Sequence, residues 1–337
     1  MKFDALVVVS FGGPEGPDDV MPFLQNVVRG RAVPTERLEK VAGQYDRFGG
    51  VSPINELNRR LIDDIRRTLT AQDRELPVYW GNRNWYPYLD DVIEEMRDDA
   101  IERAAAFVTS AYSSYSSCRQ YIEDIEAARE RVGLDAPEVI KLRPFFNHPG
   151  FVEPLADGLR EALKEHPDAA VLMTAHSIPA AMAGASDYER ELCDVANVVG
   201  QSAGALTWQI VYQSRSGRPG QPWLGPDIND AINELNDKTK TVVVVPIGFV
   251  SDHMEVVHDL DLVAKDTAAK RGIELIRTPT PGTDPRFAGM VLDLVAEAEN
   301  PEVTPKVIGD LPASLFPCRT GCCPSGSVDS INSAQPT

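Results

Sequence analysis

Short apolar runs alternate with longer amphipathic stretches along almost the whole chain. The runs have the length and β-branched content of buried strands, whereas the stretches repeat apolar residues at the spacing of one helix face. Strands that alternate with helices in this way build right-handed βαβ units and hence parallel sheets. Eight strands are predicted, at Asp4–Ser10, Pro77–Trp80, Ala104–Thr109, Glu138–Leu142, Ala169–Ala175, Thr207–Gln213, Thr241–Val245 and Glu274–Arg277.

The eight strands fall four to each half of the chain, and 337 residues are enough for two domains with their own cores. We therefore predict an α/β protein with two Rossmann-like lobes, each a four-stranded parallel sheet flanked by helices. The first lobe is expected to contain residues 1–150 and 285–326, and the second residues 151–284. Residues 327–337 are rich in Ser and polar residues and are predicted to be a disordered tail. Helices are predicted at Asn55–Thr70, Cys118–Arg131, Phe151–Lys164, Glu189–Val199, Glu255–Arg271 and Pro285–Glu299.

Two polar motifs stand at the ends of predicted strands. In TAHSIP, Thr174–Pro179, the strand run stops at His176. In VVVVPIGFVSDHMEVVHDLDL, Val242–Leu262, the run stops at Pro246 and a helix begins near Glu255. Ligands of open α/β sheets bind outside the carboxyl ends of the strands, so these two side chains are expected to face one cavity. Together they can bind a metal ion or move protons. Each alone is more often structural, the imidazole as a hydrogen-bonded group and the carboxylate as a partner of the helix dipole.

Two other motifs match known signatures only in part. The loop Phe11–Pro14 contains two glycines after a strand, but Pro14 removes an N–H and no Lys-Ser/Thr follows, which argues against a phosphate loop. Close approach of the backbone to a flat ligand suits these glycines better. Gly200–Gly204 reads G-x-S-x-G, but the helix precedes it and the strand follows it, so Ser202 is not expected to be a nucleophile.

Taken together, AHSIP and P-GFVSDH-E resemble the two signatures of the ferrochelatase family, and the resemblance extends over nearly the whole chain. It implies the chelatase fold and a lyase that inserts Fe²⁺ into a free-base porphyrin in heme biosynthesis. His176 and Glu255 would be the catalytic pair and the ligands of the Fe²⁺ substrate, with the roles of base and ligand left open between them. Asp259 and Asp266 either continue an acidic stripe for Fe²⁺ or protons, or form an ordinary solvated face. Asn84 stands where the family often has a His of an outer metal site, which puts that site in doubt.

A porphyrin is a flat apolar disc with carboxylates on its rim, so its pocket needs aromatic or aliphatic walls and a few hydroxyl or cationic groups. Such groups gather in three loop-like segments of the first half of the chain. The family resemblance implies that the porphyrin contacts are Ser52, Tyr121, Arg29, Tyr45 and Phe11. Many similar bacterial proteins carry Tyr where Phe11 stands, so an axial phenolate is missing here.

The five cysteines are unevenly spread. Cys318, Cys322 and Cys323 crowd together near the end, whereas Cys118 and Cys193 stand alone. In a cytoplasmic protein such a group indicates metal or cluster ligation before a disulfide, and four thiolates suit Zn²⁺ or a [2Fe–2S] cluster. The family resemblance implies the cluster, with Cys118 and the three C-terminal cysteines as ligands. Cys193 is then expected to be an ordinary core thiol.

Charge and hydropathy narrow the partners. With 33 Lys and Arg against 51 Asp and Glu, the formal net charge is −18, which argues against nucleic acid or an anionic membrane surface. No apolar run approaches the roughly 18 residues of a membrane-spanning helix, and the first residues lack the features of a signal peptide. We therefore expect a cytoplasmic monomer whose partners are a porphyrin and Fe²⁺.

The segment YSSCRQYIEDI, Tyr115–Ile125, is most similar to the iron–sulfur-containing members of the family from actinobacteria. Those members use coproporphyrin III, so the resemblance implies coproheme as the product. The alternatives are a protoporphyrin IX ferrochelatase, a cobalt chelatase of related fold, and a two-lobed protein that binds a tetrapyrrole without catalysis.

Overall fold

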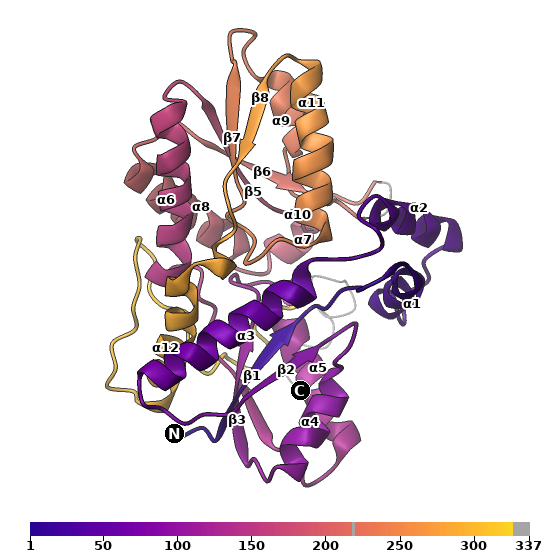
Figure 1. Cartoon of the computed structure of the whole chain (residues 1–337), viewed down its shortest axis with the longest axis vertical. Helices are drawn as coiled ribbons and strands as arrows, with labels where there is room; N and C mark the ends of the chain where they lie inside the picture. Colours follow the sequence, from indigo (N-terminus) through magenta and orange to yellow (C-terminus); the bar gives the residue numbers. More distant parts are fainter. Residues whose placement is uncertain (218–219, 326–337) are drawn as a thin grey trace, which may run out of the picture. The chain divides into compact units, whose positions relative to one another are not determined.

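The computed structural model describes residues 1–217 and 220–325, and in them it contains two parallel sheets of four strands each (Figure 1). The first sheet has the order β2-β1-β3-β4 and the second the order β6-β5-β7-β8. The eight predicted strands and the α/β fold class are thereby confirmed. The predicted disordered stretch 327–337 lies outside the described residues. The strands are β1 Ala5–Ser10, β2 Val78–Asn82, β3 Arg103–Val108, β4 Glu138–Lys141, β5 Ala170–His176, β6 Gln209–Gln213, β7 Thr241–Val245 and β8 Glu274–Arg277.

The described residues form two compact units with one sheet in each. Unit 1 comprises Met1–Thr109, Tyr121–Leu142 and Ser251–Met254, and the other described residues belong to unit 2. Residues 285–325 thus group with unit 2, whereas the predicted first lobe included residues 285–326. The limits of the predicted lobes stay a prediction.

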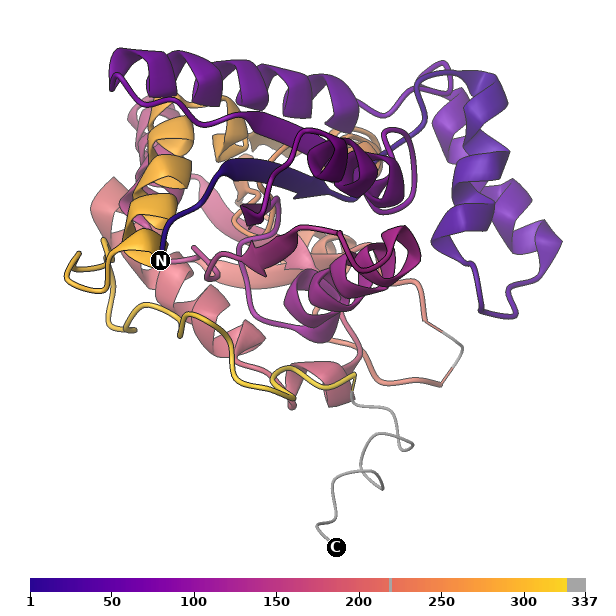
Figure 2. The same cartoon turned by 90° about the horizontal axis from the view of Figure 1, so that it is seen from below.

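The core of unit 1 lies where its sheet packs against α4 (Leu89–Asp98) and α5 (Gln120–Val132). Every residue of β1 is buried, as is usual in a parallel sheet that is covered on both faces. The helix α3 (Ile54–Ala71) contacts β2. The helices α1 (Pro17–Val27) and α2 (Thr35–Asp46) pack against each other and stand to one side of the sheet of this unit (Figure 2).

The sheet of unit 2 carries helices on both faces (Figure 1). On one face α6 (Pro149–Glu165) contacts β7 and α8 (Tyr188–Ala203). On the other face α9 (Ile228–Glu234) and α11 (Lys265–Lys270) contact β6 and β8 and share one apolar core with the sheet. The short helix α7 (Ala180–Ala183), the turn η3 (Pro281–Thr283) and the helix α12 (Pro285–Glu299) also belong to unit 2. Within the described ranges, no helix has the length and apolar character needed to cross a bilayer.

Two of the predicted helices contain a π-helical turn. The predicted helix Glu255–Arg271 consists of α10 (Met254–His258), the π-helical turn η2 (Asp259–Ala264) and α11. The predicted helix Cys118–Arg131 begins with the π-helical turn η1 (Tyr115–Arg119) and continues as α5. A single wider turn shifts the apolar pattern only once, so sequence periodicity does not reveal it. Such turns occur frequently at functional sites.

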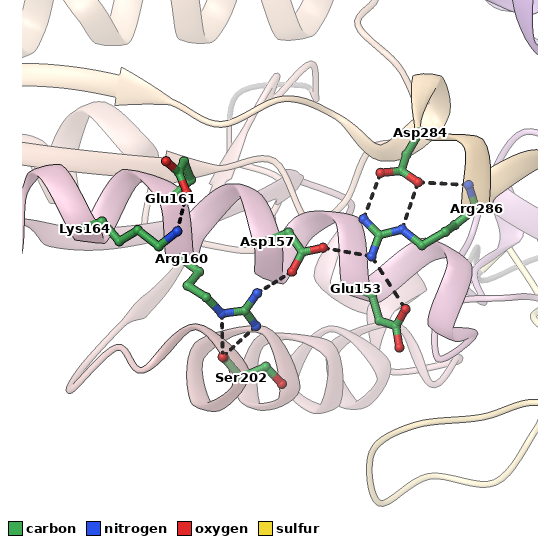
Figure 3. A network of polar contacts seen from close by, with 8 residues as sticks. All are labelled: Glu153, Asp157, Arg160, Glu161, Lys164, Ser202, Asp284 and Arg286. Carbon is green, nitrogen blue, oxygen red and sulfur yellow. Dashed lines mark hydrogen bonds and ion pairs between the residues drawn. The ribbon is translucent and has the colours of Figure 1, made fainter.

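A chain of ion pairs on the surface of unit 2 joins α6 to its neighbours (Figure 3). Asp157 pairs with Arg160 and accepts a 2.8 Å hydrogen bond from Arg286. Asp284 caps α12 and also binds Arg286, while Arg160 donates to the backbone carbonyl of Ser202 at 2.8 Å. Most of these residues line a surface pocket of about 240 Å³, but each guanidinium already has a carboxylate partner. The network is therefore structural, and Ser202 lies near the carboxyl end of α8, which excludes a strand-to-helix nucleophile turn.

Candidate functional site

His176 is the last residue of β5, at the carboxyl end of the unit 2 sheet. Its ring nitrogen Nδ1 lies against the carbonyl oxygen of Ser177. A carbonyl can only accept, so Nδ1 carries the proton of the neutral ring and Nε2 carries a lone pair. The backbone carbonyl of His176 accepts a 2.9 Å hydrogen bond from the hydroxyl of Tyr188. These contacts fix the ring and leave Nε2 available for chemistry.

Glu255 lies in the first turn of α10 and faces that nitrogen. Its Oε1 is 3.4 Å from His176 Nε2, and the two side chains are 50% and 31% exposed, so a ligand can reach both. When the imidazole is neutral, two lone pairs face each other across this gap. The gap therefore favours a shared proton or a metal ion. The structure brings the two predicted residues together within unit 2.

The surroundings raise the pKa of His176 above its ordinary value of 6.5. Burial lowers the pKa, but the charge of Glu255, its hydrogen bond and the Ser177 carbonyl outweigh that effect. The negative charge of Asp259 acts in the same direction. The pair therefore binds a proton more firmly than a free imidazole does, and a metal ion has to displace that proton.

The loop that follows β7 passes so close to β5 that position 248 has room only for glycine. The N–H of Gly248 donates to the Thr174 carbonyl at 2.9 Å, which draws the loop onto β5. A Cβ at this position would lie 2.6 Å from Cα of Ala175, closer than real Cβ contacts come. A larger residue would therefore push the loop away from the strand that carries His176.

Asp259, one turn beyond Glu255, is held by two side chains. The Ser214 hydroxyl donates to Oδ2, and Nδ1 of His258 lies 2.9 Å from Oδ1. Because its charge is felt at His176, Asp259 belongs to the surroundings of the pair. A role of Asp259 in an acidic stripe for Fe²⁺ or protons stays a prediction.

Asp266 has a different environment. It forms a 2.6 Å ion pair with Lys270 one turn further along α11, and both side chains are largely exposed. This is the arrangement of an ordinary solvated helix face, which was the alternative interpretation of the stripe.

Gln213 and Ser214 are two residues of the site that the sequence patterns did not predict. Gln213 ends β6 in register with His176, and its side-chain Nε2 donates to the backbone carbonyl of Glu255 at 2.9 Å. The signal that could have found both residues is the same that selected His176, namely a polar residue where a buried strand ends.

Three of the predicted porphyrin contacts lie in an aromatic and polar region of unit 1. Phe11 is partly exposed and its ring contacts Phe23, with the ring centroids 6.2 Å apart. Phe23 in turn contacts Tyr45 and Trp85, both buried. Phe23 and Trp85 were not predicted, and they join Phe11 and Tyr45 into one apolar wall. Arg29, on the nearby turn after α1, donates to Asn26.

Tyr121 is buried beneath a cation that sequence analysis did not single out. The guanidinium carbon of Arg83 lies 4.5 Å from the centre of the Tyr121 ring and 5.9 Å from that of Phe11, and the same guanidinium pairs with Asp124. Burial raises the pKa of Tyr121, although Arg83 lowers it. The phenol therefore keeps its proton at neutral pH and can donate a hydrogen bond.

Ser52 and Asn84 shape the loop after β1. Ser52 is buried and its N–H donates to the Pro14 carbonyl at 2.8 Å, while a Cβ on Gly13 would lie 2.7 Å from Cβ of Ser52. Gly12 has φ of +80°, and a Cβ there would meet Asn82 at 2.9 Å. The two glycines are thus required by the packing of the loop itself. Asn84 donates from Nδ2 to the Phe11 carbonyl at 3.2 Å, which is a structural role.

Three of the four predicted cluster ligands lie near one another in unit 2. Burial raises the pKa of Cys323 to about 12, and the neighbouring thiols of Cys118 and Cys322 and the carboxylate of Glu191 add to the shift. The thiol of Cys318 instead lies 3.9 Å from the Leu315 carbonyl. Three of the four predicted ligands are thus neighbouring thiols, and thiolates are the ligands that an iron–sulfur cluster requires. Within residues 1–217 and 220–325, however, no group of three or more His, Cys, Asp or Glu side chains has the geometry of a formed metal site.

The prediction for Cys193 was wrong. This thiol is exposed on α8, whose buried positions include Leu192, Val195, Ala196 and Val199. The apolar pattern of the helix was read correctly, but Cys193 falls one position away from Leu192 and so faces outward.

Buried carboxylates of α8 hold both chain segments that carry the gathered cysteines. Glu191 accepts two hydrogen bonds of 2.6 Å from the N–H and the hydroxyl of Ser113, five residues before Cys118. Asp194 accepts from the backbone N–H groups of Asp310 at 2.9 Å and Leu311 at 3.4 Å. The segment 301–325 belongs to unit 2 and has no helix or strand. It lies beside α8, to which Asp194 binds it (Figure 2).

Further buried side chains anchor the same segment. Asn147 donates to the carbonyls of Leu311 at 2.8 Å and Pro312 at 3.1 Å. Arg143 pairs with Glu297 at 2.6 Å and donates to the Lys306 carbonyl at 3.2 Å. A chain without regular structure is thus fixed by side chains before it reaches Cys318.

Comparison with known proteins shows the family to which the chain is similar. A family model described as ferrochelatase matches residues 3–299. The ferrochelatase of Rhodopirellula baltica is 49% identical over 327 residues, which cover 95% of this chain and 93% of that protein. The coproporphyrin III ferrochelatase of Streptomyces coelicolor is 48% identical over 351 residues, covering 96% and 94% of the two chains.

A solved structure shares the fold. The sirohydrochlorin chelatase SirB from Bacillus subtilis subspecies spizizenii, in complex with cobalt, gives a TM-score of 0.54 at 13% identity and covers 90% of this chain and 97% of its own. At this identity the likeness shows the chelatase fold alone.

Proposed function

This chain belongs to the ferrochelatase family, and we propose that it inserts Fe²⁺ into coproporphyrin III to give coproheme in heme biosynthesis. The observation that carries the reaction is the pair formed by His176 Nε2 and Glu255 Oε1, 3.4 Å apart and open to ligands. The full-length similarity to a coproporphyrin III ferrochelatase supports the choice of porphyrin.

The reaction exchanges one divalent cation for two protons. Fe²⁺ enters the ring while two pyrrole N–H protons leave, so the charge balances. Glu255 and His176 offer the carboxylate and imidazole ligands that suit Fe²⁺ and hold the ion before transfer. When the ion moves to the ring nitrogens, both ligand lone pairs become vacant, and each can accept one proton. Glu255 is half exposed and can pass its proton to solvent.

We assign the porphyrin contacts to unit 1. The partly exposed ring of Phe11, backed by Phe23 and Tyr45, offers an apolar wall for the macrocycle. Tyr121, Ser52 and Arg29 supply the hydroxyl and cationic groups that carboxylates on the porphyrin rim require. Four such carboxylates distinguish coproporphyrin III from protoporphyrin IX, which has two.

One assay tests the substrate. Fe²⁺ and either coproporphyrin III or protoporphyrin IX are mixed with the protein under anaerobic conditions, and absorbance follows the loss of free base. We expect the higher kcat/KM with coproporphyrin III. A preference for protoporphyrin IX would support that alternative, Co²⁺ insertion without Fe²⁺ insertion would support a cobalt chelatase, and tight binding with no insertion of either ion would support a non-catalytic carrier.

We further propose a [2Fe–2S] cluster held by Cys118, Cys318, Cys322 and Cys323. The closeness of three of these thiols and the anchoring of the tail support the set. Cys318 would have to leave the Leu315 carbonyl to take part. The cluster would tie the C-terminal segment to η1 and stabilise the folded chain, because metal binding and folding are coupled.

Iron and colour test the ligand set. The anaerobically purified protein should be red-brown, contain about two irons per chain for a [2Fe–2S] centre, and bleach with dithionite. Cys118→Ser should remove the colour, whereas Cys193→Ser, a change of the exposed thiol, should keep it. A colourless wild type, or a brown Cys118→Ser with a pale Cys193→Ser, would refute the assignment.

The enzyme is also proposed to act as a cytoplasmic monomer. The high negative charge supports a soluble protein that stays unassociated. Sedimentation equilibrium should give the mass of one chain, and the mass of a dimer would contradict the proposed monomer. Fractionation of cells should recover the protein with the cytosol, and recovery with membranes would contradict the proposed location.

A further inference from the structure

Gln213 is hydrogen-bonded to Glu255 and to Ser177, the residue that follows His176. It is the last residue of β6 and pairs in register with His176 on β5. Its backbone carbonyl accepts a 2.8 Å hydrogen bond from the N–H of Ser177, the residue whose own carbonyl meets His176 Nδ1. One side of Gln213 is thus joined to the segment that orients the imidazole.

The side chain of Gln213 reaches the other member of the pair. Its Nε2 donates to the backbone carbonyl of Glu255 at 2.9 Å. The orientation of the amide is fixed by this contact, because the opposite orientation would set two acceptor oxygens against each other. Glu255 lies on α10 just before the π-helical turn η2, where the backbone changes its hydrogen-bonding pattern. An external donor at this carbonyl holds the helix at that change.

The chemistry of Gln213 argues against a mere packing role. The residue is 1% exposed, and its Oε1 is buried without a hydrogen-bond partner among the described atoms. A buried amide with an unsatisfied oxygen is costly, so an apolar side chain would fill the same space better. The N–H bond to Glu255 is the contact that an apolar side chain could not replace.

The next residue makes a second tie to the same helix. Ser214 has a φ of +60°, a left-handed conformation that is uncommon for serine, and its hydroxyl donates to Asp259 Oδ2. Asp259 lies one turn after Glu255. Gln213 at the end of β6 and Ser214 directly after it therefore hold the helix of Glu255 at two successive turns.

We propose that Gln213 is a positioning residue for metal insertion: it fixes Glu255 opposite His176 Nε2 through the Glu255 carbonyl. This inference rests on the proposed roles of Glu255 and His176. Gln213 touches neither substrate nor metal in this account, and it acts through the placement of the Glu255 carboxylate.

A double-mutant cycle tests the proposal. Gln213→Met keeps the length of the side chain and removes the donor, and it should lower the kcat of metal insertion by roughly ten- to a hundredfold, the scale expected for a small misplacement of a reacting group. The porphyrin KM should stay unchanged. Because Gln213 acts through Glu255, the double variant Gln213→Met/Glu255→Gln should be no slower than Glu255→Gln alone. Gln209→Met, in the exposed first position of the same strand, is the matched control and should leave kcat unchanged.

Two results of these kinetic measurements would overturn the positioning role of Gln213. One is a double variant whose loss of kcat equals the product of the losses in the two single variants. The other is a Gln213→Met enzyme that is as fast as the Gln209→Met control. Gln213→Leu provides a second variant should Gln213→Met not fold, since its uncharged apolar side chain also lacks the donor. A proton NMR titration of His176 in the metal-free and porphyrin-free protein gives a readout that does not need turnover. Its pKa in Gln213→Met should move toward the value in Glu255→Gln, and an unmoved pKa would contradict the positioning role even if the proposed reaction itself failed in the substrate assay.

Discussion

The proton on one imidazole nitrogen sets the pH dependence expected of the enzyme. Nδ1 of His176 is held by a carbonyl, so only Nε2 titrates toward the substrate. Burial lowers the pKa of His176, but Glu255, the Ser177 carbonyl and Asp259 together outweigh that effect. Protonated His176 cannot bind Fe²⁺ or accept a pyrrole proton, so kcat/KM should rise with pH through a pKa above 6.5.

Glu255→Gln should move the rise of kcat/KM, the acid limb of the pH profile, to lower pH. Burial then acts on the pKa of His176 without the opposing carboxylate. The remaining activity will be low, but the midpoint of its pH profile can still be measured. Asp266→Asn removes a charge that is already paired with Lys270 and serves as the control, with no shift expected. A limb that stays in place in Glu255→Gln, or moves upward, would contradict the coupling of the two groups.

The hydroxyl of Tyr121 is expected to act in binding. Tyr121→Phe should raise the porphyrin KM more than it lowers kcat, because a rim contact stabilises the ground state and the transition state alike. Steady-state kinetics with coproporphyrin III measure both constants. Tyr79→Phe, which removes a hydroxyl bound to Asp99 in the same unit, should leave KM unchanged. An unchanged KM in both Tyr121→Phe and Ser52→Ala would place the porphyrin elsewhere.

At the scale of elements, the loop after β7 depends on a close approach that only glycine allows. Gly248→Ala would set a Cβ 2.6 Å from the backbone of Ala175, and overpacking of this kind costs roughly 1–3 kcal/mol. The thermal midpoint should fall by several degrees, at about 2–4 °C per kcal/mol for a domain of this size. Metal insertion should fall as well, because the loop leads into α10.

Gly289→Ala is the matched control for that change. Gly289 lies inside α12 and a Cβ there would meet nothing within 4 Å. Alanine is favoured over glycine in a helix by roughly 0.5–1 kcal/mol, so the midpoint should rise slightly. Equal midpoints for the two variants would show that the approach at Gly248 does not limit stability.

The C-terminal segment is held in place by side chains, and Asp194 is the anchor with the clearest test. Asp194→Asn replaces one acceptor oxygen by a donor facing a backbone N–H, so residues 309–311 should loosen. Trypsin should then cut after Arg319 faster than in the wild type, and iron content should fall. Asp310→Asn makes the same change of charge but keeps the backbone N–H that Asp194 binds. Equal cleavage rates in the two variants would argue against the anchor.

For the whole molecule, much of the fold could be predicted because strand and helix periodicities are properties of short windows. The runs at Ala5–Ser10 and Thr241–Val245 are buried on both faces and therefore read as continuous apolar strands. The π-helical turns were missed, since one added residue barely alters the pattern. Cys193 was placed wrongly because a thiol is apolar enough to belong to either face of an amphipathic helix.

The candidate site could be predicted only where a chemical group follows a strand directly. His176 and Glu255 were found by that signal and by the motifs, and the structure sets them 3.4 Å apart. Gln213 also ends a buried strand, but it lies outside the two motifs and was therefore not predicted. Arg83 and Phe23 act through contacts with residues far along the chain, such as Tyr121 and Tyr45, and such contacts leave no local pattern.

The central claim is that His176 and Glu255 perform metal insertion and are not merely part of a porphyrin-binding protein. The measurement that tests it most directly compares coproporphyrin III binding, by fluorescence quenching, with anaerobic Fe²⁺ insertion in His176→Ala. We predict a folded variant whose porphyrin affinity is close to that of the wild type and whose insertion rate is lower by roughly a hundredfold or more, the scale of a lost proton-transfer group. Near-normal insertion by His176→Ala, with binding intact, would contradict the account.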